Sequence, residues 1–155
     1  MIASWVSIIF SQETGPVMRA RDLMRRDVLT VCEDDPIDEV LDALVGKHIH
    51  GAPVVNSRGE LVGLISQVDL HFGMITRKPV DGPGPPSSDG CAITVKEVMT
   101  APAVAANEGI KIGDLCKMMH RLRIHRVPIV NQGKVTGMIS SLDICGAVGR
   151  GETLV

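Results

Sequence analysis

Two short stretches of the sequence combine a hydroxyl and a carboxylate at the same spacing. Ser66 stands three residues before Asp69, and Ser140 stands three residues before Asp143. Each serine follows an apolar stretch and precedes one with helical spacing, so each pair belongs at a helix N-terminus, where free backbone N–H groups and the helix dipole favour an anion. There the serine would bind phosphate and the aspartate would accept hydrogen bonds from ribose hydroxyls. The same residues also form ordinary helix caps, and this alternative stays open.

A second candidate for phosphate binding is the pair His125 and Arg126, which begins the stretch HRVPIV. The arginine guanidinium is planar and permanently charged, which suits phosphate oxygens, and the histidine adds another donor. The similar stretch HGAPVV contains His50 and Gly51, so it lacks the arginine. Two alternatives stay open here, a solvated Arg126 in a surface ion pair and histidines with a structural role.

These candidates occur in pairs because the chain contains an internal repeat. A shift of 75 residues aligns Met24 with Met99, and a shift of 74, after one deletion in a turn, aligns Gly63 with Gly137. Pro, Gly and Ser residues separate the two copies and are typical of a linker. We expect an N-terminal extension at 1–17, repeats at 18–75 and 93–150, a linker at 76–92 and a C-terminal tail at 151–155.

The apolar spacing within each copy predicts the element order β-α-β-β-α. In the first copy, Pro36 begins a stretch with helical spacing, GAPVV and LVGLIS indicate two strands joined by a tight turn, and a last helix starts after Ser66. The second copy repeats this plan. One such unit buries little apolar area, so we expect an α/β (α+β) fold in which two repeats pack about a pseudo-twofold axis and share a core.

Composition argues against several classes of function. Lys and Arg total 16 against 18 Asp and Glu, without a basic run, so we expect no nucleic-acid binding. The four cysteines form no CxxC pair, which predicts reduced thiols and no metal site. The motifs GxSxG, GxxxxGK[ST] and HExxH are absent, so we expect no enzyme activity. The apolar opening is too short to span a bilayer, which predicts a cytoplasmic protein without membrane insertion.

The repeated segments resemble the CBS domain, and the chain as a whole resembles a tandem CBS pair, or Bateman module. The resemblance covers about residues 18–150 and depends on three pairs of segments in order: MRRDVLTV and VMTAPAVAA, HGAPVV and HRVPIV, and GELVGLISQVDL and GKVTGMISSLDI. It implies two equivalent clefts between the repeats, which commonly bind AMP, ADP, ATP or S-adenosylmethionine. It implies no required cofactor.

The resemblance also implies which residues line each cleft. Each cleft would take its ribose- and phosphate-binding groups from one copy and its base-binding strand from the start of the other. The first cleft would combine His125, Arg126, Ser140 and Asp143 with Thr30, Ile49, His50 and Gly51. The second would combine Ser66 and Asp69 with Thr100, Ala105, Ile124 and His125. Because only the first contains an arginine from the HRVPIV position, we expect it to bind more tightly.

The expected role is that of a regulatory adenine-nucleotide sensor that acts on a partner protein. The sequence does not identify this partner. The alternative is a structural module whose clefts bind no ligand and whose helix faces dock a partner enzyme or transporter. Apolar residues on the last helix of each repeat predict a homodimer. These residues are Val68, Phe72 and Ile75, and Ile144, Cys145 and Val148.

Overall fold

The computed structural model of the chain describes residues 17–76, 93–152 and 154. Most of the predicted N-terminal extension and nearly all of the predicted linker therefore lie outside the described residues. The boundaries expected for these two segments stay predictions.

The described residues form two units with the β-α-β-β-α order that the sequence predicts. The first unit, repeat 1, contains β1 (Val31–Cys32), α2 (Ile37–Gly46), β2 (Gly51–Val55), β3 (Leu61–Ser66) and α3 (Gln67–Ile75). The second unit, repeat 2, contains β4 (Ala106–Asn107), α5 (Ile112–Leu122), β5 (Arg126–Asn131), β6 (Lys134–Ser140) and α6 (Ser141–Gly149). A short helix precedes each unit, α1 (Ala20–Leu23) and α4 (Val95–Val98).

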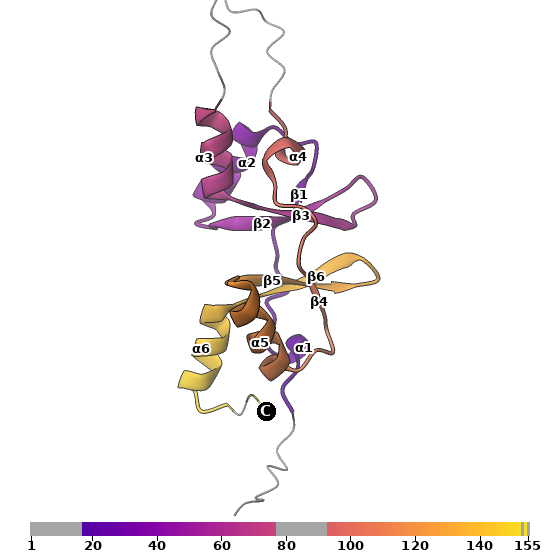
Figure 1. Cartoon of the computed structure of the whole chain (residues 1–155), viewed down its shortest axis with the longest axis vertical. Coiled ribbons are helices and arrows are strands. Elements are labelled where there is room, and N and C mark those ends of the chain that lie inside the picture. The colour runs from indigo at the N-terminus through magenta and orange to yellow at the C-terminus, as the bar shows by residue number, and fades with distance from the viewer. Residues whose placement is uncertain (1–16, 77–92, 153, 155) are drawn as a thin grey trace, which may run out of the picture.

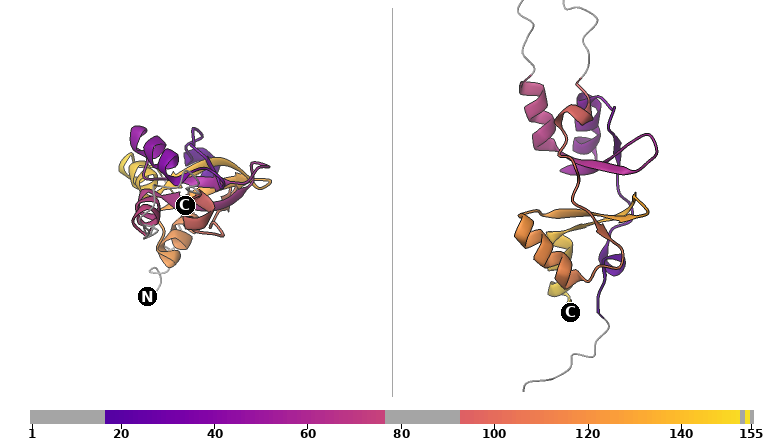
Figure 2. Two further views of the ribbon diagram at one scale, coloured as in Figure 1. Left: turned by 90° about the horizontal axis from the view of Figure 1, so that it is seen from above. Right: turned by 45° about the vertical axis from the view of Figure 1, so that its right-hand side comes forward.

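Each repeat builds one three-stranded sheet. The first strand pairs in parallel with the second, and the second pairs antiparallel with the third. In the turns of the two hairpins, Gly59 and Gly133 have φ angles of 75° and 79°, a left-handed conformation that favours glycine. The two sheets face one another in the middle of the molecule, and the helices cover their outer sides (Figures 1 and 2).

The core consists of one aliphatic cluster per repeat. Leu44 and Leu70 are fully buried in repeat 1, and Ile112 and Ile129 are fully buried in repeat 2. Leu44, Leu70 and Ile112 are buried because helical spacing places them on the side that faces the sheet, whereas Ile129 lies on the central strand β5. Burial of such residues in two packed layers supplies most of the free energy of folding.

The short helices are exchanged between the repeats. Ala20 and Met24, at α1, belong to the core cluster of repeat 2, whereas Val95 of α4 belongs to that of repeat 1. Backbone hydrogen bonds hold both helices in place, from Ala20 N to the Ile110 carbonyl at 2.9 Å and from Val95 N to the Asp35 carbonyl at 3.0 Å. Figure 1 shows α1 beside α5 and α6, and α4 beside α2 and α3. The two repeats therefore share one folded body.

Close packing between these lead-in segments and the sheets explains two repeated residue types. A Cβ atom at Gly137 would lie 2.5 Å from Met24 Sδ, and one at Gly63 would lie 2.5 Å from Met99 Sδ. Beyond each methionine, the chain pairs with a strand of the opposite repeat, since Arg25 bridges to Met138 and Thr100 bridges to Leu64. The aligned methionines and glycines are thus partners across the two repeats.

One of the six apolar residues predicted to lie on the exposed faces of α3 and α6 is buried instead. Ile144 is only 8% exposed and belongs to the core, so its assignment to the exposed face was wrong. Its side chain points inward because α6 begins one residue after Ser140, which places Leu142 on the outer side, with 78% of its surface exposed. Across residues 17–76 and 93–152, no helix has both the length and the apolar character needed to cross a membrane.

Candidate functional site

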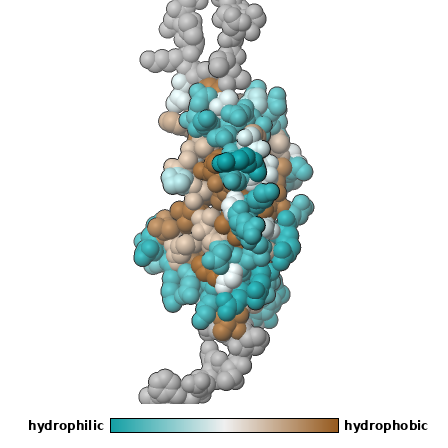
Figure 3. Space-filling view, turned by 90° about the vertical axis from the view of Figure 1, so that its right-hand side faces the viewer, coloured by the Kyte–Doolittle hydropathy of each residue, from teal (hydrophilic) through white to brown (hydrophobic). Residues whose placement is uncertain are grey.

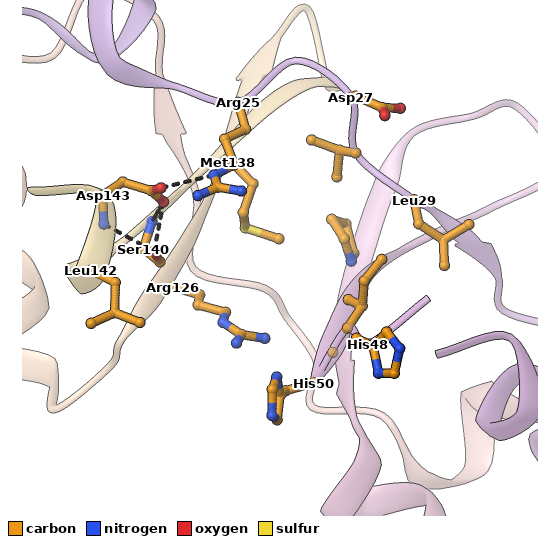
Figure 4. A pocket seen from close by; sticks show the side chains of 14 residues that line it. Arg25, Asp27, Leu29, His48, His50, Arg126, Met138, Ser140, Leu142 and Asp143 are labelled. Carbon is orange, nitrogen blue, oxygen red and sulfur yellow. Dashed lines mark hydrogen bonds and ion pairs between the residues drawn. The ribbon is translucent and has the colours of Figure 1, made fainter. Parts of the chain in front are cut away.

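A cavity of about 320 Å³ lies between the two repeats, close to the start of α6. Its lining comes from three parts of the chain: the segment after α1, the start of β2, and the β5–β6–α6 region of repeat 2. The lining residues are Arg25, Asp27, Val28, Leu29, His48, Ile49, His50, Gly51, Pro53, Arg126, Met138, Ser140, Leu142 and Asp143. Figure 4 shows the labelled residues converging from both repeats.

Ser140 and Asp143 form a capping box at the N-terminus of α6. The Ser140 hydroxyl and backbone N–H both donate to Asp143 Oδ2, at 2.6 Å and 2.8 Å, and the Asp143 N–H donates to Ser140 Oγ at 3.3 Å. Ser140 and Asp143 therefore do cap α6, as the alternative left open by the sequence predicted. The box occupies Oδ2 and leaves Oδ1 of the carboxylate for another partner.

That partner is Arg25, whose Nε donates to Asp143 Oδ1 at 2.8 Å. Only 11% of the Asp143 side chain is exposed, against 77% of the Arg25 side chain. Burial on its own raises the pKa of Asp143, but the hydrogen bonds from Ser140 and Arg25 outweigh it and hold the pKa below its ordinary value. Asp143 is therefore a carboxylate near neutral pH and fixes one edge of the Arg25 guanidinium.

Arg126 supplies a second guanidinium on the same side of the cavity. It is half-buried at the start of β5, where its backbone pairs with Ser140 of β6. Within the described part of the chain, its side chain makes neither an ion pair nor a hydrogen bond, so the ion-pair alternative finds no support there. His48 and His50, just before and at the start of β2, also line this cavity (Figure 4). Two guanidiniums, one of them paired with Asp143, and the imidazole groups of His48 and His50 give this cavity several hydrogen-bond donors for an anion.

The rest of the lining is apolar. Val28, Leu29, Ile49 and Pro53 come from repeat 1, and Met138 comes from β6. Seen from the side, apolar residues show at the level where the two repeats meet, between polar regions above and below (Figure 3). A cavity with an apolar wall, a few fixed polar groups and one helix N-terminus can hold a flat ring and an attached anionic group together.

The structure brings six of the predicted residues of the first cleft into this one cavity. They are Ile49, His50, Gly51, Arg126, Ser140 and Asp143. Two others are not in its lining. Thr30 is exposed, one residue beyond Leu29, and His125 lines a different cavity, between α5 and α6. Their role in ligand binding stays a prediction.

The residues predicted for the second cleft do not meet in either cavity described here. Ser66 and Asp69 form the same capping box at the start of α3, with the Ser66 hydroxyl donating to Asp69 Oδ2 at 2.6 Å. Thr100 is exposed and Ala105 is half-buried, and neither lines a described cavity. Ile124 and His125 line the cavity between α5 and α6.

The two capping boxes have different neighbours. Asp143 faces Arg25, but the residue aligned with Arg25 in the other copy is Thr100. Gly51 stands at the position aligned with Arg126, and a Cβ atom there would lie 2.6 Å from the Ile65 carbonyl oxygen. Backbone crowding therefore keeps a side chain out of this position, so neither position aligned with the two arginines supplies a guanidinium to the capping box of α3.

The sequence analysis missed the segment after α1 as part of the lining. Arg25, Asp27, Val28 and Leu29 line the cavity, although only Thr30 was predicted there. The available signal was the aligned Met–Gly pairs, because Met24 packs on Gly137 and so carries the next residues into the space beside Ser140. His48, Pro53, Met138 and Leu142 were also missed, since no residue type at these positions indicates a ligand.

The described residues contain neither a cluster of metal-ligating side chains nor a disulfide. Among the described residues, no set of three or more His, Cys, Asp or Glu side chains could hold a metal ion. Cys32, Cys116 and Cys145, which all lie in described segments, are free.

Curated proteins similar to this chain include two from Methanocaldococcus jannaschii. Uncharacterized protein MJ1225 is 26% identical over 129 residues, which cover 83% of this chain and 42% of that protein. Uncharacterized protein MJ1426 is 27% identical over 157 residues, covering 86% of this chain and 93% of that protein. The inosine-5'-monophosphate dehydrogenase of Nitrosopumilus maritimus is 30% identical over 135 residues, covering 86% of this chain and 25% of the enzyme. The chain thus spans less than half the length of MJ1225 and of this enzyme.

Solved structures show the same fold. The CBS domain pair of protein MJ0100, in complex with 5'-methylthioadenosine and S-adenosyl-L-methionine, has a TM-score of 0.72 at 24% identity and covers 88% of this chain and 100% of that one. The CBS domain of a membrane protein from Sphaerobacter thermophilus has a TM-score of 0.66 at 28% identity, covering 84% and 87%. CBSX2 in complex with AMP has a TM-score of 0.69 at 22% identity, covering 85% and 96%.

The family model of the CBS domain matches this chain twice, at residues 20–77 and 95–150. These two matches contain all the strands and helices of repeat 1 and repeat 2. The chain therefore belongs to the CBS domain family and contains a tandem pair of these domains.

Proposed function

We propose that the cavity beside Asp143 binds an adenine nucleotide and that the chain is a regulatory sensor of this nucleotide. The observation that carries the proposal is the pair of guanidiniums, Arg25 and Arg126, that lines one cavity together with a helix N-terminus and an apolar wall. The solved CBS structures with AMP and with S-adenosyl-L-methionine support an adenosine ligand. The proposed role is not catalytic and needs no cofactor.

Each part of the nucleotide would have its own partners. Arg126 and the unbonded Nη groups of Arg25 would bind phosphate oxygens, because both side chains carry permanent charge. Asp143 Oδ1, which Arg25 already contacts, would accept a hydrogen bond from a ribose hydroxyl. The base would lie against Leu29 and Ile49.

Charge also distinguishes among the candidate ligands. Arg126 carries a permanent charge that no described side chain neutralises, and Arg25, although bound to Asp143 through Nε, still presents its two Nη groups. Such a site favours AMP, ADP or ATP over S-adenosylmethionine, whose sulfonium group carries a positive charge. Each added phosphate gives the two guanidiniums further acceptor oxygens, so we propose that affinity rises from AMP to ATP.

Signalling would follow from the position of the cavity. Ligand contacts both repeats there, so it stabilises the arrangement of repeats that gives it the most contacts. A partner protein that distinguishes this arrangement would then respond to nucleotide concentration. We propose a cytoplasmic location, where adenine nucleotides are present.

The deciding experiment is a thermal-shift titration of nucleotide-free protein with AMP, ADP, ATP and S-adenosylmethionine. A ligand that binds only the folded state raises the melting temperature in a saturable way. Asp143→Ala should abolish the shift. Asp69→Ala is the matched control, because it removes the same capping box in repeat 1 but leaves the cavity beside Asp143 intact. Loss of the shift in Asp69→Ala alone would contradict the proposed site.

A second candidate function has its own observation. Val68, Phe72 and Ile75 of α3 expose 75%, 67% and 81% of their surfaces, which favours a protein interface. We propose that this face contributes to a homodimer. If none of the four ligands shifts the melting temperature, the chain is better described as a docking module for a partner enzyme or transporter.

A further inference from the structure

A second cavity, of about 280 Å³, lies between α5 and α6 and has no part in the proposed nucleotide site. Its lining comes from α5, from α6 and from the three residues that join α5 to β5, and none of these residues lines the cavity beside Asp143. A water molecule takes up about 30 Å³ of the liquid, so this cavity has room for a ligand of about ten non-hydrogen atoms. A whole nucleotide is too large for it.

The cavity follows from three positions at which the two repeats differ. Repeat 2 has the smaller side chain at each, since Cys116 aligns with Leu41, Ser141 with Gln67, and Cys145 with His71. In repeat 1, Leu41 is buried, and the Gln67 side chain reaches across to the Ile49 carbonyl, to which it donates at 2.8 Å. In repeat 2, the corresponding space is left open and forms the cavity.

Most of the lining is apolar. Met119, Ile124 and Ile144 belong to it, and Met119 and Ile144 are only 5% and 8% exposed. Cys116 adds to this apolar surface, because burial raises the pKa of its thiol and keeps it uncharged near neutral pH. Apolar atoms of a ligand gain free energy when they leave water for such a surface.

The basic side chains of the lining are hydrogen-bond donors for an anion. Arg123 carries a permanent charge, and within the described part of the chain its side chain makes neither an ion pair nor a hydrogen bond. The imidazole groups of His120 and His125 can donate as well. No Asp or Glu of residues 17–76 or 93–152 lines this cavity. A guanidinium binds a carboxylate through two parallel hydrogen bonds, so Arg123 suits this group in particular.

We infer that the α5–α6 cavity is a second ligand site, which binds a small carboxylate with an apolar body. The carboxylate would pair with Arg123, and the apolar body would lie against Met119, Ile124 and Ile144. With room for about ten non-hydrogen atoms, the cavity fits an unbranched carboxylate of about eight carbon atoms. The chain would then bind two classes of small molecule, each in its own cavity.

Titration calorimetry of the nucleotide-free chain with octanoate tests this site. We expect saturable binding of one octanoate per chain. 1-Octanol has the same apolar chain without the charge, so it should bind about tenfold more weakly, because a hydrogen bond to a charged group is lost. Arg123→Gln should weaken octanoate binding about tenfold and leave octanol binding unchanged. Arg121→Gln, the same charge change on an exposed residue of α5 outside the cavity, is the matched control and should bind octanoate like wild type.

Two variants that fill the cavity test its volume. Cys116→Leu introduces the residue that repeat 1 has at this position and should abolish binding of both compounds. Ser141→Gln does the same from α6, so the test does not depend on the folding of one variant. A single cooperative melting transition shows that each variant is folded.

Four outcomes would overturn the site. They are a wild-type chain without saturable octanoate binding, octanol that binds as tightly as octanoate, equal losses in Arg121→Gln and Arg123→Gln, and folded filling variants that bind octanoate like wild type. ATP binding is measured on the same variants. Because the two cavities share no lining residue, a chain that binds octanoate but not ATP would contradict the proposed function and leave this inference intact.

Discussion

Asp143 and its two arginine neighbours carry the difference between a helix cap and a binding site. Both repeats contain the Ser–Asp capping box, yet among the residues that the structure describes only the box of α6 has an arginine bonded to its carboxylate. The hydroxyl and the carboxylate therefore cap the helix in both repeats, and the proposed selectivity for anions depends on the arginines at one of them. The proposed function thus depends on positions at which the two copies differ in sequence.

Arg126→Gln should weaken ATP binding by roughly tenfold or more, because a hydrogen bond to a charged group contributes about 1.5–3 kcal/mol. Isothermal titration calorimetry on the folded variant measures the loss. Arg123→Gln removes an exposed arginine outside this cavity and should bind ATP like wild type. Equal losses in both variants would show a general effect of net charge instead.

Asp143 should also make the stability of the protein depend on pH in acid. Because the folded-state pKa of Asp143 is lowered, its stabilisation is present above its unfolded pKa, near 3.8, and is lost as the pH falls through the folded value. Asp143→Asn should therefore be less stable than wild type at pH 7, by about 1–2 kcal/mol, and the difference should shrink below about pH 4. Urea unfolding at pH 7 and pH 3 checks this. A difference that stays constant would exclude ionisation as its source.

At the scale of elements, α1 packs against β6, where Met24 lies directly over Gly137. Gly137→Ala should lower the free energy of unfolding by about 1–3 kcal/mol, since the added Cβ would meet the Met24 side chain at 2.5 Å. In the double variant Gly137→Ala/Met24→Ala, removal of the methionine side chain should relieve part of this loss. A double-mutant cycle measures the coupling free energy between the two positions. Gly149→Ala is the control, because its Cβ enters open space at a helix end. Additive losses would argue against the crossing contact.

The strands and helices of the two β-α-β-β-α units were predictable from the sequence because they have strong local signals, whereas the short helices α1 and α4 were not predicted. Period-3.6 spacing gives α2 and α5, and the Ser–Asp boxes mark the starts of α3 and α6. The cavity was predicted in part, through the aligned motifs. The contribution of Arg25 was not, since it follows from contacts between residues more than one hundred positions apart. Sequence periodicity contains no information on such a crossing.

For the whole molecule, the two capping boxes predict unequal binding. Calorimetric titration with ATP should give one tight site per chain, and Asp143→Ala should remove it. Asp69→Ala should retain it, because the positions aligned with Arg25 and Arg126, the arginines beside Asp143, are Thr100 and Gly51 at the other capping box. Retention of the tight site in Asp143→Ala, with its loss in Asp69→Ala, would reverse the order of the two clefts.

Because α1 packs in the core of repeat 2 and α4 in the core of repeat 1, the repeated segment of sequence is not the same as the folded unit. The sequence repeats once, but a chain with a single copy would lack the helix that completes its own core. Each copy therefore depends on the lead-in helix of the other to complete its core in this structure. The present chain should accordingly melt in one calorimetric transition. Fragments separated between residues 77 and 92 should gain native structure only when mixed.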